Sequence, residues 1–285
     1  MDKIITMPPA LNINKDAYQF LGKLQYDIYS CEEPSIVLDF TPCTFSDAAF
    51  TAYFGALRSL AQKWEKNVKF KTTAGNLQRY FLNSGLYDHF TSSTIKHANK
   101  NSIPFTQVNL DDDSLVDYIG NILDLAPITL SEKCRDSLFK NIYEIFTNAV
   151  EHSNSQFGVF ACGHWMPTKK KLVFSVCDTG LGIPRTIKRT NSTFSSNQAL
   201  LWALKRGNST KQLSDGVPRG LGLSDLKDFI KLNNGDLNIF TNDIYYNCST
   251  EETTTSLRYD ILGTLITLTI TADYNHVYIL KEERS

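Results

Sequence analysis

The chain has 285 residues, which is long for one compact core and sufficient for two domains of ordinary size. Its 29 lysines and arginines nearly balance 30 aspartates and glutamates, so the net charge of −1 excludes a global field that recruits nucleic acid or anionic lipid. With 42% hydrophobic and 21% charged residues, the chain can bury a core and does not have the composition of a disordered protein.

Two further patterns narrow the class of protein. The start of the sequence has no basic segment followed by a long apolar one, and nothing approaches the roughly 20 apolar residues of a membrane helix, so we expect a cytoplasmic protein. The six cysteines form no CxxC pair, and the five histidines are dispersed. We therefore expect reduced thiols and no structural metal site.

The first half of the sequence alternates strand and helix patterns. Residues 35–40 ("SIVLDF") and 67–72 ("NVKFKT") are typical of short strands. Residues 47–66 carry apolar side chains at helical spacing, and residues 76–90 predict a helix that stops near Gly85. This order predicts a small α/β layer with helices against a sheet.

A polar stretch separates this half from the rest. Residues 91–102 ("TSSTIKHANKNS") are polar, and Pro104 follows them. We therefore predict an α/β domain at 1–100, a linker with an acidic helix at 101–127, and a second domain at 128–285.

The second domain begins with the longest predicted helix. Residues 129–154 carry a periodic apolar face over about six turns, with Ser131 as a plausible N-cap. Later in the chain we predict strands at 157–165 and 171–177, a short helix at 197–207, a helix at 221–232, closing strands that include "DLNIF" and "GTLITLTIT", and a loop at the Glu/Thr run 250–256.

The first of three motifs lies on the long helix. Glu144, Asn148 and His152 are spaced i, i+4, i+8, which keeps them on one stripe of a helix surface. An amide oxygen such as that of Asn148 suits Mg²⁺, which takes its other ligands from phosphates and water. Glu144, one turn earlier, could orient or deprotonate an attacking hydroxyl. Taken alone, the pattern also fits a solvated helix face.

The second motif is "DTGLGIP" (178–184), at the end of a predicted strand. An ionised Asp178 only accepts hydrogen bonds, so it could hold the exocyclic amino group of adenine and would repel the keto oxygen of guanine. Gly180 and Gly182 allow unusual φ angles and a close approach of a flat base to the backbone. The alternative is an ordinary turn at a strand end, for which aspartate and glycine are common.

The third motif is "PRGLGLSDL" (218–226), before a predicted helix. Gly220 and Gly222 would leave free N–H groups and the positive end of the helix dipole for phosphates. Arg219 and Lys211 could add positive charge in the same region. A single glycine pair of this kind is weak evidence by itself.

The three motifs occur in one order, and each stands at the element boundary that its chemistry requires. "EIFTNAVEH", "DTGLGIP" and "RGLGL" resemble the N, G1 and G2 boxes of the GHKL ATPase/kinase superfamily, which includes gyrases, MutL, heat-shock chaperones and histidine kinases. The similar span is roughly 128–272, about half of the chain. Other nucleotide motifs fit less well, because GxxxxGK[ST] is absent and Arg185 stands where GxGxxG needs its third glycine.

The resemblance implies a Bergerat fold, with helices on one face of a mixed sheet and ATP between the helices under a mobile lid at about 185–219. It implies that Asn148 binds Mg²⁺, that Glu144 is the catalytic base, and that Asp178 recognises adenine with support from the strand residue Thr264. The other nucleotide-binding residues that it implies are His152, Gly180, Gly182, Ile183, Lys211, Arg219, Gly220, Leu221, Gly222 and Leu223.

The first half is similar to STAS domains, the α/β modules of anti-sigma-factor antagonists. In those antagonists the phosphorylated serine follows the aspartate of the loop, whereas here Ala48 follows Asp47 and Ser46 precedes it. We therefore expect a docking or packing module and no phospho-acceptor.

Several functions remain open within this superfamily. "EIFTNAVEHSN" most resembles the anti-sigma serine-kinase branch, so we expect a cytoplasmic ATP-binding protein that hydrolyses Mg-ATP or phosphorylates a protein serine or threonine. Lid closure would then regulate a protein partner, STAS-like or another regulator, and ATP-dependent homodimers are common in the superfamily. The alternative is a nucleotide-sensing module without catalysis.

Two other branches are disfavoured. Neither His89 nor His97 lies in the long paired-helix pattern that a histidine kinase needs for its phosphorylated histidine. A DNA-linked ATPase is expected to continue into a transducer domain after "LTITA" and to carry a basic stripe, and the sequence shows neither.

Overall fold

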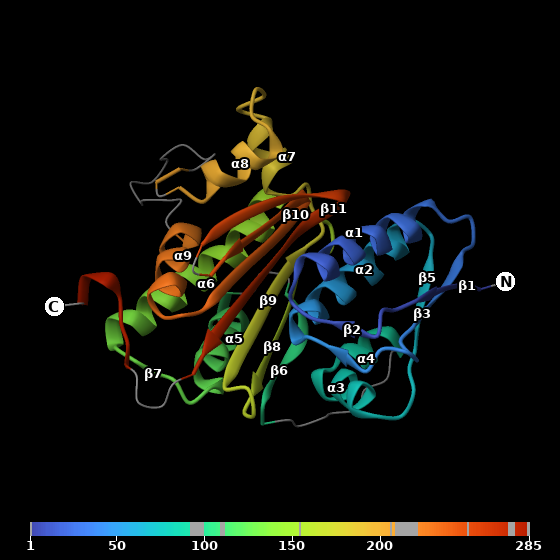
Figure 1. Cartoon of the computed structure of the whole chain (residues 1–285), viewed down its shortest axis with the longest axis horizontal. Coiled ribbons are helices and arrows are strands. Elements are labelled where there is room, and N and C mark those ends of the chain that lie inside the picture. The colour runs from blue at the N-terminus through green and yellow to red at the C-terminus, as the bar shows by residue number, and fades with distance from the viewer. Residues whose placement is uncertain are drawn as a thin grey trace.

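The protein is described by a computed structural model, which covers residues 2–91, 100–108, 112–153, 155–205, 207–208, 222–249, 251–272 and 277–283; at 112–113, 151–153, 222 and 281 it describes the backbone alone. The architecture is α+β. A three-stranded sheet lies in the amino-terminal half and a five-stranded sheet in the carboxy-terminal half (Figure 1).

The amino-terminal sheet has the parallel order β1-β3-β5, formed by Lys3–Thr6, Ser35–Asp39 and Asn67–Lys71. The helices of this half are α1 (Lys15–Ser30), α2 (Thr51–Lys63), α3 (Asn76–Ser84) and α4 (Leu86–Thr91). The predicted strands at 35–40 and 67–72 are confirmed, and so is the helix break at Gly85, where φ is +80°. Helix α1, whose N-cap is Asn14, is an element beyond those predicted from the sequence.

Short elements complete the chain: strands β2 (Ala10–Leu11), β4 (Phe45–Ser46), β7 (Thr129–Leu130) and β12 (Val277–Tyr278), and 3-10 turns at Ala48–Phe50 and Lys281–Glu283. They form two separate parallel pairs, β2 with β4 and β7 with β12.

The carboxy-terminal sheet has the order β10-β11-β9-β8-β6, formed by Asp236–Cys248, Glu252–Thr271, Lys171–Asp178, Val159–Met166 and Ser102–Val108. Every neighbouring pair in it is antiparallel. The prediction of a mixed sheet is therefore wrong for this sheet, because its strands are joined as hairpins or through helices that return the chain in the opposite direction.

Two other predictions about this region need correction. The segment 101–127, predicted as a linker with a helix, supplies the edge strand β6 as well as the helix α5 (Asp112–Leu125). The run 250–256, predicted as a loop, is largely the start of β11, where β-branched threonines suit a strand.

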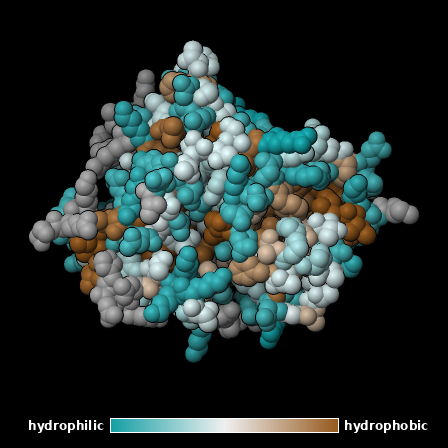
Figure 2. Space-filling view, viewed as in Figure 1, coloured by the Kyte–Doolittle hydropathy of each residue, from teal (hydrophilic) through white to brown (hydrophobic). Residues whose placement is uncertain are grey.

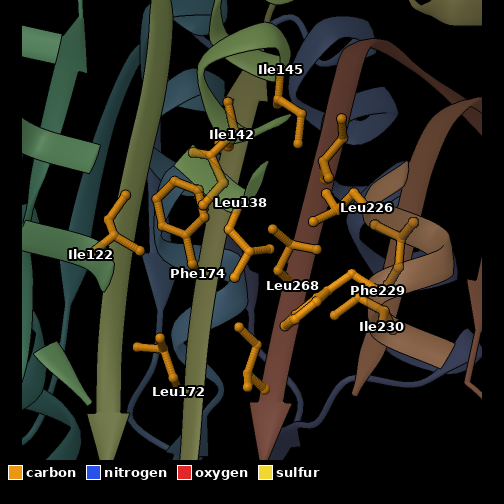
Figure 3. Packing of buried hydrophobic residues seen from close by; sticks show 14 of the residues in the cluster. Ile122, Leu138, Ile142, Ile145, Leu172, Phe174, Leu226, Phe229, Ile230 and Leu268 are labelled. Atoms are coloured by element: carbon orange, nitrogen blue, oxygen red, sulfur yellow. The ribbon is translucent and has the colours of Figure 1, made fainter. Parts of the chain in front are cut away.

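Three helices cover one face of this sheet: α5, α6 (Glu132–Ser153) and α9 (Gly222–Leu232). Leu138, Ile142 and Ile145 of α6 and Leu226, Phe229 and Ile230 of α9 pack together over β9 and β11 (Figure 3). Their i, i+3, i+4 spacing places these apolar side chains on the inner face of each helix, so the two helices lie side by side on the sheet.

The amino-terminal half covers the opposite face. A second hydrophobic cluster joins residues of α1 and α2 to residues of the five-stranded sheet: Phe160, Val173, Cys177, Phe240 and Leu265. The ring of Tyr18 in α1 stacks on that of Tyr245 in β10, with 4.6 Å between centroids. The five-stranded sheet is thus buried on both faces, by its own helices on one and by the amino-terminal half on the other (Figure 1).

The outer surface is mainly polar on the face that Figure 2 shows, and hydrophobic residues reach it in separate groups. All six cysteines are free thiols, and only Cys31 is not buried. In the described part of the chain no helix has the length and apolar character to cross a membrane.

Candidate functional site

The first motif lies on α6, the longest helix among the described residues. The Ser131 hydroxyl accepts a hydrogen bond from the Cys134 N–H at 3.1 Å, which confirms the predicted N-cap. Glu144 and Asn148 are half-buried and one turn apart in the second half of this helix. The backbone of His152 is helical, but its side chain lies outside the described part.

The end of α6 lies at the same end of the sheet as Asp178. Six residues after Ser153, where α6 ends, Val159 opens β8, and Val159 pairs with Asp178 at the end of β9. The hydroxyls of Ser155 and Thr179 are hydrogen-bonded at 2.7 Å, which ties the connection after α6 to the turn after β9. A side-chain hydrogen bond therefore joins the connection that follows the helix motif to the strand motif.

Asp178 is a buried carboxyl group with backbone donors around it. Only 5% of the residue is exposed, and its Oδ1 accepts from the Gly180 N–H at 2.8 Å. Burial raises the pKa of Asp178 from its ordinary 3.8 to about 7, while hydrogen bonds from the backbone N–H groups of Gly180 and Thr264 pull the pKa down. The protonation state of this carboxyl group therefore changes near neutral pH.

Thr264 contacts this carboxyl group through its backbone. It follows Gly263 in β11, beside the end of β9, and its N–H is one of the two donors to Asp178. Its hydroxyl pairs instead with the hydroxyl of Thr241 on β10, at 2.9 Å. Thr264, which belongs to β11, thus contacts Asp178 through its backbone and β10 through its side chain.

Gly182 shapes the turn that follows Asp178. Its φ is +82°, and a Cβ on it would lie 2.7 Å from Asn242 Nδ2 and 2.9 Å from Thr241 Oγ1. The next residue, Ile183, donates its N–H to Thr241 Oγ1 at 2.9 Å. A side chain at 182 would therefore force the turn away from β10, which is a physical reason for glycine here.

Sequence reasoning missed three residues that hold this turn. Asn242 donates to the Leu181 carbonyl at 2.8 Å and accepts from the Arg185 N–H at 3.2 Å. Thr241 accepts from Ile183, and Gly263, with φ +90°, allows β11 to pass directly against the backbone of Asp178. Asn242 lies about 60 residues from the turn in sequence, so no local sequence pattern connects the two. Gly263 precedes the predicted site residue Thr264, and this glycine was the one sequence feature that indicated a close backbone contact.

The third motif is described only in part. Helix α9 begins at Gly222, and it ends close to Asp236, which pairs with Thr269 at the end of the sheet far from Asp178. Its first turn is therefore directed toward the Asp178 end, where Leu223 packs against the core. Lys211, Arg219, Gly220 and Leu221 lie outside the described residues, and only the backbone of Gly222 is described.

The described part of the predicted lid at 185–219 includes most of the short helix α7 (Ile183–Lys188) and all of α8 (Ser196–Ala203). Residues 206 and 209–219 of the predicted lid lie outside the described residues. Ser195 and Gln198 form a capping box at the start of α8. Lys188 Nζ donates to Ser196 Oγ at 2.9 Å, so the two helices are linked. Figure 1 shows them beyond the end of the sheet at which α6 and β9 finish. The sequence predicted α8, and it missed α7.

The chemistry of these groups limits the ligand groups that they could bind. A buried carboxyl group that already accepts from two backbone N–H groups can accept from a further donor, such as an exocyclic amino group. Within the described ranges no three His, Cys, Asp or Glu side chains form a metal-binding group. A cation bound by the Asn148 amide would thus draw its remaining ligands from an anionic ligand and water, as Mg²⁺ does with phosphates.

No model of a known protein family matches this chain, and no curated protein matches it either.

Proposed function

We propose that this chain binds Mg-ATP between α6, the turn at residues 178–183 (the Asp178 turn) and the start of α9, and that it cleaves the bond between the β- and γ-phosphates. The observation that carries the proposal is Asp178: a carboxyl group that is almost fully buried, held by two backbone N–H groups and poised to ionise near neutral pH. Carboxyl groups with strongly shifted pKa values are common at functional sites. The amino group of adenine is a hydrogen-bond donor that this carboxyl group could accept from.

The resemblance to the GHKL superfamily supports the same assignment. Helices α5, α6 and α9 on one face of the sheet fit a Bergerat-type arrangement, and the parallel sheet of the amino-terminal half fits a STAS-like packing module. The five-stranded sheet departs from the mixed sheet that the resemblance implies, because all of its strand pairs are antiparallel.

Each residue has a role in the proposal. Asp178 accepts from the exocyclic amino group of adenine, and Gly182 keeps the turn after Asp178 packed against β10. Asn148 offers its amide oxygen to Mg²⁺, which neutralises phosphate charge when bound. Glu144 takes a proton from the attacking water or protein hydroxyl while the new oxygen–phosphorus bond forms and ADP leaves with the electron pair of the old one.

The test compares three variants on one helix. Glu144→Ala keeps Mg-ATP binding and loses release or transfer of γ-labelled phosphate, whereas Asn148→Ala loses the Mg²⁺-dependent part of binding. Asp136→Ala removes an exposed acid two turns earlier on α6 and changes neither. Equal turnover in the wild type and Glu144→Ala removes the catalytic assignment, and calorimetry without heat on adding Mg-ATP removes the whole proposal.

The fate of the γ-phosphate decides between the remaining functions. Labelled phosphate in solution indicates an ATPase, and label on a STAS-like or other regulatory protein indicates a serine/threonine kinase. Binding of ATP with neither product indicates a nucleotide-sensing module, in which lid closure alone regulates the partner.

A further inference from the structure

Strand β11 carries a large bulge next to the Asp178 turn. Ser256 pairs with Ile244 of β10 and Ile261 pairs with Asn242, so residues 257–260 lie opposite the single residue Asp243. We call residues 257–262 the β11 segment. A bulge of this size frees backbone N–H groups from the ladder with β10, and these groups need partners from elsewhere.

Helix α1 of the amino-terminal half supplies them. The side-chain oxygen of Gln25, which is buried, accepts from the Leu262 N–H at 2.7 Å, and that of Gln19 accepts from the Arg258 N–H at 3.1 Å. Between the two glutamines, a Cβ on Gly22 would lie 2.8 Å from the carbonyl oxygen of Tyr259. Residues 19, 22 and 25 share one face of α1, so the helix backbone lies directly against the β11 segment.

The same segment contacts the Asp178 turn on its other side. Asn242 Nδ2 donates to both the Ile261 carbonyl, at 3.3 Å, and the Leu181 carbonyl, at 2.8 Å. Arg185 forms an ion pair with Asp260. The segment leads into Gly263 and Thr264, which lie against the Asp178 backbone and carboxyl group.

We propose that α1 positions the Asp178 turn through the β11 segment, so that Gln25 and Asn242 are positioning residues of the adenine site and the amino-terminal half sets its affinity. The proposal rests on the proposed function for the identity of the ligand. Its physical basis is continuous contact: every step between α1 and Asp178 is a packed backbone, a hydrogen bond or an ion pair.

The test removes one acceptor without changing the size of the side chain. Gln25→Leu leaves the Leu262 N–H without its partner, so amide exchange at 258–264 accelerates and the affinity for adenosine falls by about two- to thirtyfold. Gln25→Glu restores an acceptor at the same distance and recovers both readouts. If Gln25→Leu does not fold, Gln19→Leu tests the same contact at a partly exposed position, with a smaller loss.

Thr51→Val is the matched control. It removes a hydrogen bond between Thr51 and Tyr80 at 2.7 Å, also in the amino-terminal half, with Thr51 as buried as Gln25. It lowers stability and leaves amide exchange at 258–264 and adenosine affinity unchanged. Equal effects of Thr51→Val and Gln25→Leu, or no effect of Gln25→Leu on either readout, overturn the positioning role.

A second readout separates this proposal from the proposed function. The carboxyl carbon of Asp178, followed by NMR against pH, shifts its titration midpoint in Gln25→Leu and keeps it in Thr51→Val. If the wild type binds no adenine nucleotide, the proposed function fails, and the midpoint shift alone still decides whether α1 positions the turn.

Discussion

Adenosine binding should release a proton from Asp178. The free protein holds this carboxyl group at a pKa of about 7, because burial outweighs the two backbone donors. Under the proposed function, the amino group of adenine adds a third donor, and donors to a carboxyl group favour its ionised form. Binding therefore selects the ionised state and drives off the proton of the protonated fraction.

The magnitude follows from the pKa. The fraction protonated in the free protein, and hence the number of protons released, is about 0.9 at pH 6, about 0.5 at pH 7 and about 0.1 at pH 8. The apparent affinity weakens about tenfold from pH 8 to pH 6, and about tenfold again by pH 5. Adenosine is the appropriate ligand because it carries no phosphate that titrates in this range.

The assay is calorimetric titration with adenosine at several pH values, each in two buffers that differ in heat of ionisation. The difference between buffers gives the number of protons released. Asp178→Asn is the control: its affinity is lower and shows no transition near pH 7. Proton uptake would mean that a neutral Asp178 donates to the base, and the absence of proton exchange would mean that adenine does not contact Asp178; either result refutes the reasoning.

Three other outcomes follow from the described contacts. The folded state keeps the Asp178 proton to a higher pH than the unfolded state, so the free energy of unfolding falls by up to about 4 kcal/mol between about pH 4 and about pH 7. Urea denaturation measures this decrease in the wild type, and the decrease is absent in Asp178→Asn. Gly182→Ala places a side chain at a positive φ and against Asn242, so it lowers the free energy of unfolding by about 2–4 kcal/mol. Gly207→Ala has a positive φ but no atom within 4 Å of the new Cβ, so it lowers the free energy of unfolding by about 1 kcal/mol, and similar losses in the two variants would contradict the contact argument. In the native protein, iodoacetamide modifies Cys31 first, because the other five thiols are buried, and peptide mapping identifies the labelled site.

Local patterns predicted the parts of the site that local chemistry determines. The cap at Ser131, the long α6 helix and the strand that ends at Asp178 all follow from residues within a few positions of one another. The partners that hold the turn could not be found in this way. Asn242 of β10 contacts Leu181, which follows β9, only because β11 pairs with both strands and the turn after β9 reaches across it.

Helix α1 shows a second kind of limit. Its cap Asn14 and its apolar spacing at Ala17, Leu21, Leu24 and Ile28 are visible in the sequence. What the sequence hides is the surface that α1 covers, since Gln19 and Gln25 look like ordinary polar helix residues until the β11 segment places two N–H groups against them. A polar residue on an inner helix face is a sign of such a backbone contact.

The choice of aspartate at position 178 is itself informative. A carboxylate offers two acceptor oxygens to the N–H groups of Gly180 and Thr264, whereas asparagine would offer one, without the cost of burying a charge. The two backbone donors offset only part of the cost of burying this carboxylate above pH 7, and a further donor from a ligand would offset more of it. Under the proposed function, the amino group of adenine is that further donor.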